Sequence, residues 1–203
     1  YIVRPVSSIE KKQIVTVKIQ FVTICSVDNL PILAYDTIIY MKGGVVIMTS
    51  LCNGWEFAFQ WSEEFAAFRS AGEPVRLPHN VAPMPQHYAD HRAYQTICGY
   101  RRSLKLDAAL KGKRLFLQFD GAAHIATVYV NGKEVGFSQI SHATSEFDIT
   151  SCLKTGENVL DVVVLKWCAS SYLECQDKFR FTGIFRSVYL LQRPQVHIRD
   201  FKI

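Results

Sequence analysis

The sequence lacks the patterns that mark several common classes of protein. Its six cysteines form no Cys-x-x-Cys pair, so the ligand spacing of a structural zinc site is absent. Its 23 Lys and Arg exceed its 18 Asp and Glu by only five, without any basic run, which argues against nucleic-acid binding. Internal repeats and low-complexity tracts are missing. Strand-like segments do not alternate with helical ones, so a parallel α/β sheet is disfavoured.

The composition is that of a globular protein. Of the 203 residues, 49% are hydrophobic and 20% are charged, a balance typical of a packed domain rather than a disordered chain. Thirteen Phe, nine Tyr and three Trp supply bulk for a core. This length suits one sizeable domain with an appendage.

The cysteines and the N-terminal apolar run bear on localisation. A domain of this size does not need disulfides, so we expect reduced thiols in a cytoplasmic protein. Residues 14–27 are apolar, but Lys18 and Gln20 interrupt them and no small-residue cleavage site follows. The run is also too short to span a bilayer. We therefore predict neither export nor membrane insertion.

The first 47 residues have two interpretations. The chain opens with Tyr1, and residues 42–44 (Lys-Gly-Gly) can be encoded by a purine-rich ribosome-binding sequence shortly before Met48. One hypothesis is that translation starts at Met48 and that residues 1–47 are upstream DNA read in frame. The alternative is a genuine β-rich extension, because the apolar run within 14–27 also reads as a strand. Peptides from 1–47 in the native host would decide between them.

From residue 51 onward the chain is a succession of short strand-like runs. Residues 115, 117 and 119 (Leu, Leu, Phe) show the two-residue alternation of a half-buried strand. Only 62–69 looks helical, and 74–90 is irregular and rich in proline. The pattern predicts an all-β sandwich or barrel. The expected strands are 55–60, 99–106, 114–119, 127–130, 134–137, 146–149, 159–166 and 184–191.

Turn residues separate these runs. Asn131-Gly132 is a strong hairpin signal because both residues tolerate positive φ, so we interpret Asn131 as a turn former rather than a sugar ligand. Gly156 opens another turn. Pro194 marks a boundary, and residues 197–203 look like the first strand of something that follows.

Three stretches resemble family 2 glycoside hydrolases of the β-galactosidase type. They are 119–136 (FDGAAHIATVYVNGKEVG), 146–167 (EFDITSCLKTGENVLDVVVLKW) and 171–190 (SYLECQDKFRFTGIFRSVYL), with weaker similarity in 53–57, 77–80 and 94–102. The resemblance implies that 48–194 form a jelly-roll β-sandwich of the galactose-binding-domain type. It also implies that 195–203 begin an immunoglobulin-like domain, with a TIM barrel after it.

The implied function is that of the N-terminal sugar-binding domain of a hydrolase acting on terminal β-galactosides. Hydrolysis with retention needs two carboxylates about 5 Å apart. In this family both lie in the barrel, so we expect this fragment to be inactive alone and the full enzyme to be a homo-oligomer. Glucuronides and mannosides remain open as substrates.

The resemblance also assigns candidate site residues. Asp177 matches the family aspartate that reaches the barrel and helps to hold galactose and a sodium ion. A structural alternative is that Asp177 pairs with Arg180 or Arg186. Arg180, Gly183 and Arg186 belong to the same signature, and we interpret them as architectural, with the arginines forming bidentate carboxylate pairs.

Other metals and cofactors are not expected in this fragment. Some relatives supply an aspartate to a magnesium site where this chain has Ala169, between Cys168 and Ser170, so such a site is doubtful. Cys175 likewise replaces an expected acidic residue. The histidines of 74–91 lack helical metal-ligand spacing; they are His79, His87 and His91.

Two other functions are compatible with the sequence. The first is a free-standing carbohydrate-binding module, for which Trp55, Trp61 and Trp167 are candidate platforms, although Trp55 and Trp167 fall in strand runs and look like core. The second is a structural interface domain used in oligomerisation. A sugar titration of the isolated domain separates the first from the second.

Overall fold

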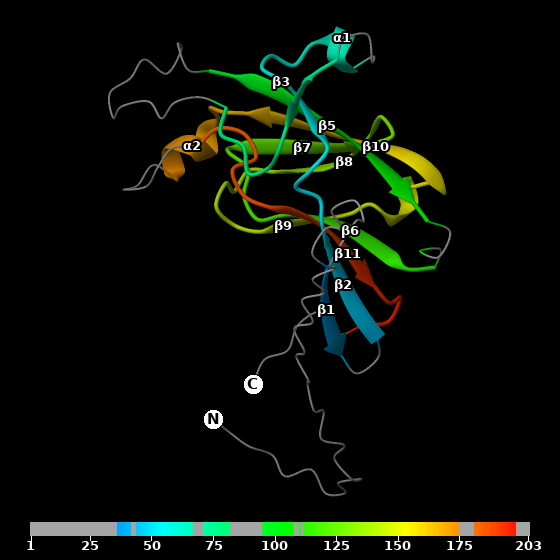
Figure 1. Ribbon diagram of the computed structural model, residues 1–203. Helices are drawn as coiled ribbons and strands as arrows, with labels where there is room; N and C mark the ends of the chain where they lie inside the picture. Colours follow the sequence, from blue (N-terminus) through cyan, green and yellow to red (C-terminus); the bar gives the residue numbers. More distant parts are fainter. Residues whose placement is uncertain are drawn as a thin grey trace, which may run out of the picture.

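The computed structural model describes residues 36–41, 44–66, 71–81, 95–107, 110, 112–174 and 181–197. Two antiparallel sheets face one another and enclose a common core (Figure 1). This arrangement confirms the predicted all-β fold and β-sandwich. Within the described ranges, none of the helices has the length and hydropathy needed to cross a membrane.

The five-stranded sheet has the order β1-β2-β11-β6-β9 and the six-stranded sheet the order β4-β3-β5-β10-β7-β8. The strands are β1 (Asp36–Met41), β2 (Gly44–Ser50), β3 (Trp55–Ala58), β4 (Glu73–Val75), β5 (Ile97–Leu106), β6 (Arg114–Phe119), β7 (Ile125–Val130), β8 (Lys133–Ser138), β9 (Ser145–Asp148), β10 (Gly156–Leu165) and β11 (Val188–Arg193). The short helices are α1 (Glu63–Ala66), η2 (Thr150–Cys152) and α2 (Ala169–Leu173).

Alternating side chains from both sheets make the core. Leu117 in β6 and Val162 in β10 are both fully buried, one from each sheet. Strand β10 lies between β5 and β7, which places its alternate residues over the centre of the core. Trp55 is 1% exposed and its indole N–H donates to the Leu51 carbonyl at 2.5 Å, so it is a core residue, as expected.

The predicted strands agree with the structure except near β11. Strand β6 has the predicted bounds, whereas β11 begins at Val188 and not at residue 184. Residues 181–187 instead form a loop in which Gly183 makes an isolated bridge to Ala123. Ile184 belongs to this loop and is completely buried. Its apolar side chain, which suggested a strand, is therefore explained by burial in a loop. The prediction missed the strands β1, β2 and β4 and the short helices η2 and α2.

The hairpin between β7 and β8 turns at Asn131 and Gly132, as predicted. Their φ angles are 52° and 79°, the left-handed conformation that this turn requires. The Asn131 amide donates to the carbonyl of Cys152 and to the side chain of Asn158, and its oxygen accepts from the Val159 N–H. These contacts confirm Asn131 as a turn former.

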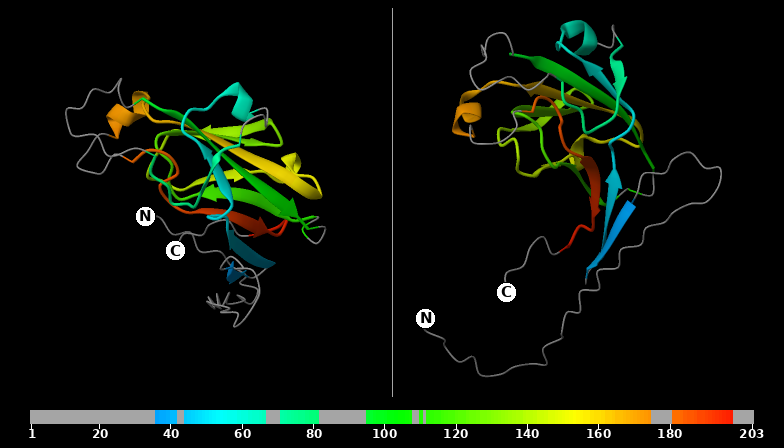
Figure 2. Two further views of the ribbon diagram at one scale, coloured as in Figure 1. Left: turned by 45° about the horizontal axis from the view of Figure 1, so that its top comes forward. Right: turned by 60° about the vertical axis from the view of Figure 1, so that its left-hand side comes forward.

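Strand β2 crosses the predicted start site. It pairs with β1 on one side and with β11 on the other, and the hairpin extends away from the sandwich (Figures 1 and 2). Met48 pairs with Leu191, and Ile47 pairs with Gln192. Translation from Met48 would keep the first pairing and remove the second, so the start-site hypothesis stays a prediction.

The predicted C-terminal boundary lies at the end of β11. This strand ends at Arg193, immediately before Pro194. Most of the segment 195–203, predicted to open an immunoglobulin-like domain, lies outside the described residues, as do residues 1–35. Both predictions therefore stand as they were made.

Candidate functional site

Buried polar groups gather where strand β10 ends. Lys166 follows the last residue of β10 and is completely buried. Its ammonium donates to the hydroxyl of Thr182, which is also fully buried, and lies 5.6 Å from the centre of the Trp167 indole ring. A lysine is rarely buried without such partners, because removing its charge from water is costly. The interior at this end of the sandwich therefore contains a buried, hydrogen-bonded lysine.

Trp167 is held in place by two neighbours. Its ring stacks on His124, with the centroids 6.3 Å apart and the planes at 22°. The Gln95 side chain accepts from the Trp167 backbone N–H at 2.9 Å and donates to the Trp167 carbonyl at 3.2 Å. The His124 imidazole contacts the Lys166 carbonyl at 2.6 Å. Trp167 is thus half-buried and not a free platform.

Helix α2 begins at Ala169, two residues after Trp167, and lies at one end of the sandwich (Figure 1). Cys168 caps it, and its backbone N–H donates to the Ser171 hydroxyl at 3.1 Å. Burial raises the pKa of the Cys168 thiol, but hydrogen bonds from the hydroxyls of Ser170 and Ser171 outweigh it and lower that pKa. Ala169 is the first residue of α2, and its side chain has no oxygen that could bind a metal.

A second polar cluster connects α2 to the loop before β9. The Glu174 carboxylate follows α2 and accepts from the Ser141 N–H, with its two oxygens 3.1 and 3.4 Å from that nitrogen. It also accepts from the Ser141 hydroxyl. That hydroxyl oxygen lies 2.6 Å from Nδ1 of His142, and Ser141 itself is fully buried. The contact fixes Glu174 against a residue 33 positions earlier in the chain.

Two signature residues, Gly183 and Arg186, lie in the described part of the chain, and both contact neighbouring segments of the sandwich. Gly183 has a φ of +92°, and a Cβ added there would lie 2.3 Å from the Tyr100 hydroxyl. Arg186 donates to the carbonyls of His142 and Asp120 at 3.1 and 3.4 Å. The carboxylate pair expected for Arg186 is not among the contacts of the described residues. Both residues order backbone segments around the loop 181–187.

The remaining signature residues lie outside the described part of the chain. These are Asp177 and Arg180, with Cys175 beside them. The described neighbours of this segment are Glu174 on one side and Phe181 on the other. The sequence therefore places Asp177 three positions beyond the residue that binds Ser141.

His79 is the one predicted loop histidine that the described ranges include. Its Nδ1 lies 3.0 Å from the Tyr100 hydroxyl. Burial lowers the pKa of His79, although the Glu73 charge acts in the opposite direction, and burial raises the pKa of Tyr100. Among the described residues no three His, Cys, Asp or Glu side chains are grouped so as to hold a metal ion. His87 and His91 lie outside these residues.

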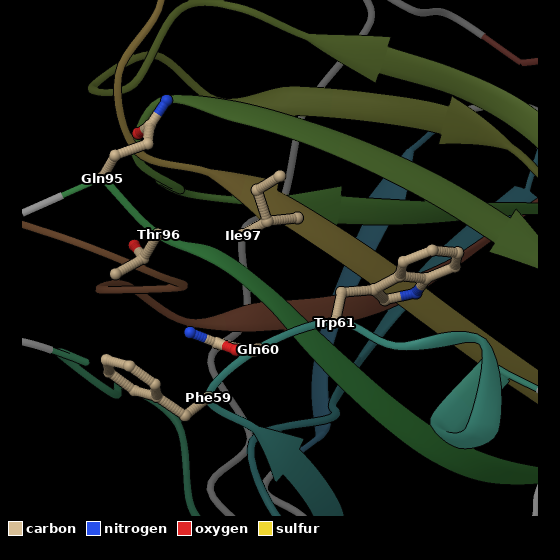
Figure 3. Close-up of a pocket in the computed structure, with 6 residues that line it drawn as sticks. All are labelled: Phe59, Gln60, Trp61, Gln95, Thr96 and Ile97. Carbon is tan, nitrogen blue, oxygen red and sulfur yellow. The ribbon is translucent and has the colours of Figure 1, made fainter. Parts of the chain in front are cut away.

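A pocket of about 290 Å³ opens beside the start of β5, at Ile97 (Figure 3). A hydrogen bond joins the two chain segments that line it, because the backbone N–H of Trp61 donates to the Ile97 carbonyl at 2.6 Å. Phe59 is 53% exposed and Trp61 is 40% exposed, so two aromatic side chains border the pocket. Its lining consists of Phe59, Gln60, Trp61, Gln95, Thr96 and Ile97.

The sequence prediction missed the polar groups that order this end of the molecule. Lys166 and Glu174 lie inside the quoted stretches, but no pattern in the sequence indicates that one is buried and the other binds Ser141. A serine in a loop carries little signal of its own. These residues emerge only from the three-dimensional arrangement.

Comparison with known proteins confirms the resemblance seen in the sequence. The family described as glycosyl hydrolases family 2, sugar binding domain, matches residues 53–194. A β-galactosidase of Actinobacillus pleuropneumoniae is 56% identical over 111 residues, which cover 54% of this chain and 11% of that protein. A β-galactosidase of Staphylococcus xylosus is 45% identical over 107 residues, or 52% of this chain and 11% of that protein.

The fold has matching solved structures. The β-glucuronidase of Bacteroides uniformis superposes with a TM-score of 0.63 and 27% identity, covering 73% of this chain and 18% of that one. The chain thus spans about a tenth of the two curated relatives and under a fifth of this structure. The match over residues 53–194 includes every described strand from β3 to β11. The chain therefore belongs to the sugar binding domain family of the family 2 glycosyl hydrolases.

Proposed function

We propose that this chain is the N-terminal sugar-binding domain of a β-galactosidase, and that the hydrolysis of terminal β-galactosides is carried out by a longer protein containing it. The observation that supports this most is the 56% identity to the β-galactosidase of Actinobacillus pleuropneumoniae over 111 residues. The chain spans 11% of that relative, and following the resemblance to the family we place the two catalytic carboxylates in a barrel beyond it. The isolated chain is expected to be inactive.

Within this proposal, Asp177 binds the sugar. A carboxylate accepts hydrogen bonds from two hydroxyl groups and suits a hard cation such as sodium. Residues 174 and 182, on either side of the segment that carries Asp177, both make polar contacts with buried partners. We place Asp177 at the galactose subsite formed with the barrel, with sodium as its second partner.

The test is made on the longer protein encoded by the source DNA. It should hydrolyse a nitrophenyl β-galactoside much faster than the corresponding β-glucuronide or β-mannoside. Asp177→Asn should lower kcat/KM by roughly 10- to 100-fold, the value of a lost hydrogen bond to a charged group. Glu157→Gln, an exposed carboxylate in β10, is the matched control and should leave kcat/KM unchanged.

Two results would overturn the proposal. If the reading frame ends at residue 203, there is no barrel and the hydrolase function fails. If the longer protein prefers β-glucuronides, the family assignment stands but the substrate is wrong.

The proposal also covers the localisation and the oligomeric state of the complete enzyme. Four described cysteines are free thiols: Cys52, Cys98, Cys152 and Cys168. Free thiols suit the reducing cytoplasm, where we place the enzyme. We expect the complete enzyme to be a homo-oligomer. Fractionation of native cells and sedimentation of the complete enzyme check these two points.

The pocket beside β5 favours a second candidate function, saccharide binding by this domain itself. Exposed aromatic rings beside amide and hydroxyl groups are the usual surface for a sugar, whose C–H face packs on the ring while its hydroxyls bind polar atoms. Phe59 and Trp61 supply the rings, and Gln60 supplies an exposed amide (Figure 3). Among the described residues, the buried Thr96 hydroxyl at the pocket has no hydrogen-bond partner.

Titration of the 203-residue chain with methyl β-galactoside and with lactose tests this candidate. Binding at this pocket should change the fluorescence of Trp61, and Trp61→Ala should remove the saturable response. Phe137→Ala, which also removes an exposed aromatic ring, but from β8, is the control. A response that persists in Trp61→Ala, or no response at all, would reject the pocket as a sugar site.

A further inference from the structure

Helix α1 is a single turn, Glu63–Ala66, and it comes shortly after the pocket residues in the chain. Phe59, Gln60 and Trp61 lie between the end of β3 at Ala58 and this turn (Figure 3). A helix of four residues is not stable by itself, because fixing its first turn costs more free energy than one hydrogen bond returns. Contacts with the sandwich must therefore hold the turn in place.

Arg101 supplies such a contact from β5. Tyr100 beside it belongs to the core, so Arg101 points to the outer face of the six-stranded sheet, yet it is only 6% exposed. Its Nη2 donates to the Ala66 carbonyl at 3.2 Å, and its Nε donates to the Asp161 carboxylate at 2.6 Å. The last carbonyls of a helix have no partner within it, and a cation also complements the negative end of the helix dipole. Arg101 therefore caps the end of α1 from the sheet below.

Asp161 fixes the direction of that guanidinium group. It lies directly opposite Arg101 in the register of β5 and β10. The side chains of Arg101 and Asp161 are 8% and 18% exposed, so their ion pair is largely shielded from water. A guanidinium group carries its donors in one rigid plane, so the bond to Asp161 also sets where the nitrogen that reaches Ala66 lies.

The chain before the turn is fixed by backbone contacts. The Trp61 N–H donates to the Ile97 carbonyl at 2.6 Å, and the Ala66 N–H donates to the Ser62 carbonyl at 3.0 Å. Trp61 thus lies between a contact with β5 on one side and a turn held by Arg101 on the other. It is 40% exposed and borders the pocket.

We propose that Arg101 and Asp161 are positioning residues for the saccharide pocket at Trp61. By holding α1 they fix the chain that carries the aromatic rings of Phe59 and Trp61, so a sugar meets rings that are already in place and little ordering remains to be done on binding. This inference rests on the second candidate function, because it takes the pocket as a saccharide site. It adds two residues that do not line the pocket.

The first measurement needs no sugar. Hydrogen exchange by mass spectrometry compares the wild-type 203-residue chain with the double variant Arg101→Met with Asp161→Leu. This variant removes the ion pair without leaving a buried charge unpaired, so its melting temperature should change little. Exchange in peptides that contain 59–66 should still become faster, because the end of α1 loses its donor. Arg114→Met with Asp148→Leu, which removes a 2.6 Å pair from the five-stranded sheet, is the matched control and should leave these peptides unchanged.

The second measurement is a lactose titration of the same chains, followed by tryptophan fluorescence. The double variant Arg101→Met with Asp161→Leu should bind lactose roughly 5- to 20-fold more weakly than the wild type, the loss expected when an aromatic side chain has to be ordered on binding. The matched control should bind as the wild type does.

Two single variants separate the ion pair from the contact with α1. Asp161→Asn keeps an acceptor oxygen for Arg101 and leaves the bond to Ala66, so it should bind lactose almost as the wild type does. Arg101→Lys has one nitrogen in place of a planar group and cannot reach both acceptors in the same geometry. It should bind nearly as weakly as the double variant.

The results separate the positioning role from the sugar site itself. Unchanged exchange in 59–66 for the double variant overturns the positioning role whatever the titration gives. Faster exchange with unchanged lactose affinity also overturns it, because the contacts then order the segment without affecting the pocket. If the wild type gives no saturable response to lactose, the second candidate function fails and the positioning role fails with it. Only when the wild type binds does an unaffected double variant count against Arg101 and Asp161 alone.

Discussion

A Cβ placed on Gly183 would lie 2.3 Å from the hydroxyl oxygen of Tyr100. The same position would be 2.7 Å from the Val81 side chain, and the φ of Gly183 is +92°. A side chain at residue 183 is therefore opposed both by the backbone conformation and by the space around it. The loop 181–187 depends on this close approach, because Ile184, the next residue, is fully buried.

Gly183→Ala should destabilise the domain more than Gly132→Ala. Both glycines have positive φ, but a Cβ on Gly132 would meet nothing within 4 Å. Gly132→Ala should therefore cost only the left-handed conformation, about 1–2 kcal/mol. Gly183→Ala should cost roughly 1–3 kcal/mol more, as for overpacking in a core. Urea unfolding of the two variants measures the difference, and equal losses would show that the contact with Tyr100 is unimportant.

Tyr100→Phe should partly relieve the Gly183→Ala defect. It removes the nearest atom, the hydroxyl, but leaves the Val81 contact at 2.7 Å. Tyr100→Phe alone loses the contact with His79 and should be destabilising by about 1 kcal/mol. In a double-mutant cycle the combined loss should be smaller than the sum of the single losses. An additive result contradicts the steric explanation.

The stability of the domain should fall as the pH drops below about 6.5, partly because of His79. Burial lowers the pKa of this imidazole in the folded state below its ordinary value of 6.5, so the unfolded state binds its proton first. The His79 contribution is present above that value and is lost between it and the folded-state pKa. His79→Gln should flatten the change in unfolding free energy between about pH 7.5 and pH 5.5. An unchanged slope would exclude His79.

Alkylation should distinguish Cys168 from Cys98. Hydrogen bonds from Ser170 and Ser171 outweigh burial and lower the pKa of Cys168, whereas burial raises the pKa of Cys98 to about 12. Because the thiolate is the reactive form, iodoacetamide at about pH 8 should label Cys168 first and leave Cys98 unlabelled in the folded chain. Peptide mass spectrometry over time measures both. Labelling of Cys98 at the rate of Cys168 would contradict the prediction.

Leu117→Ala should destabilise the domain by about 2–5 kcal/mol, the usual cost of a cavity in a packed core. Leu117 is completely buried in β6, whereas Ile140 is 60% exposed. Ile140→Ala is therefore the control and should change the unfolding free energy by less than about 0.5 kcal/mol. Urea unfolding measures both. A small loss for Leu117→Ala would mean that the region around it collapses to fill the space.

The strands were predictable wherever one face is buried and the other is not. In β6 the alternating residues Leu115, Leu117 and Phe119 are all buried, although Phe116 between them is buried as well, and in β10 burial alternates from one residue to the next. Helix α2 spans five residues, too few for a helical period to emerge. Strand β2 was overlooked because its run of apolar residues crosses the predicted start site at Met48.

The candidate site was predictable only in part. Resemblance to a family indicated Asp177 and the signature around Gly183. It did not indicate that Glu174 binds Ser141, because 33 residues separate the two and neither belongs to a periodic pattern. Similarly, a lysine after a strand is ordinary in sequence, and only the packing of Thr182 and Trp167 around it makes Lys166 a buried cation.

The place of β11 in its sheet determines when that sheet can form during synthesis. Strand β11 lies between β2 and β6, so it alone joins the β1–β2 hairpin to the β6–β9 pair. Thr49 pairs with Leu190, which means that an early-made strand waits for one of the last made in this domain. A nascent chain that has not yet released residues 188–193 from the ribosome keeps β2 and β6 as open edges. Open edges invite pairing with other chains, so this is the stage at which a chaperone would be needed.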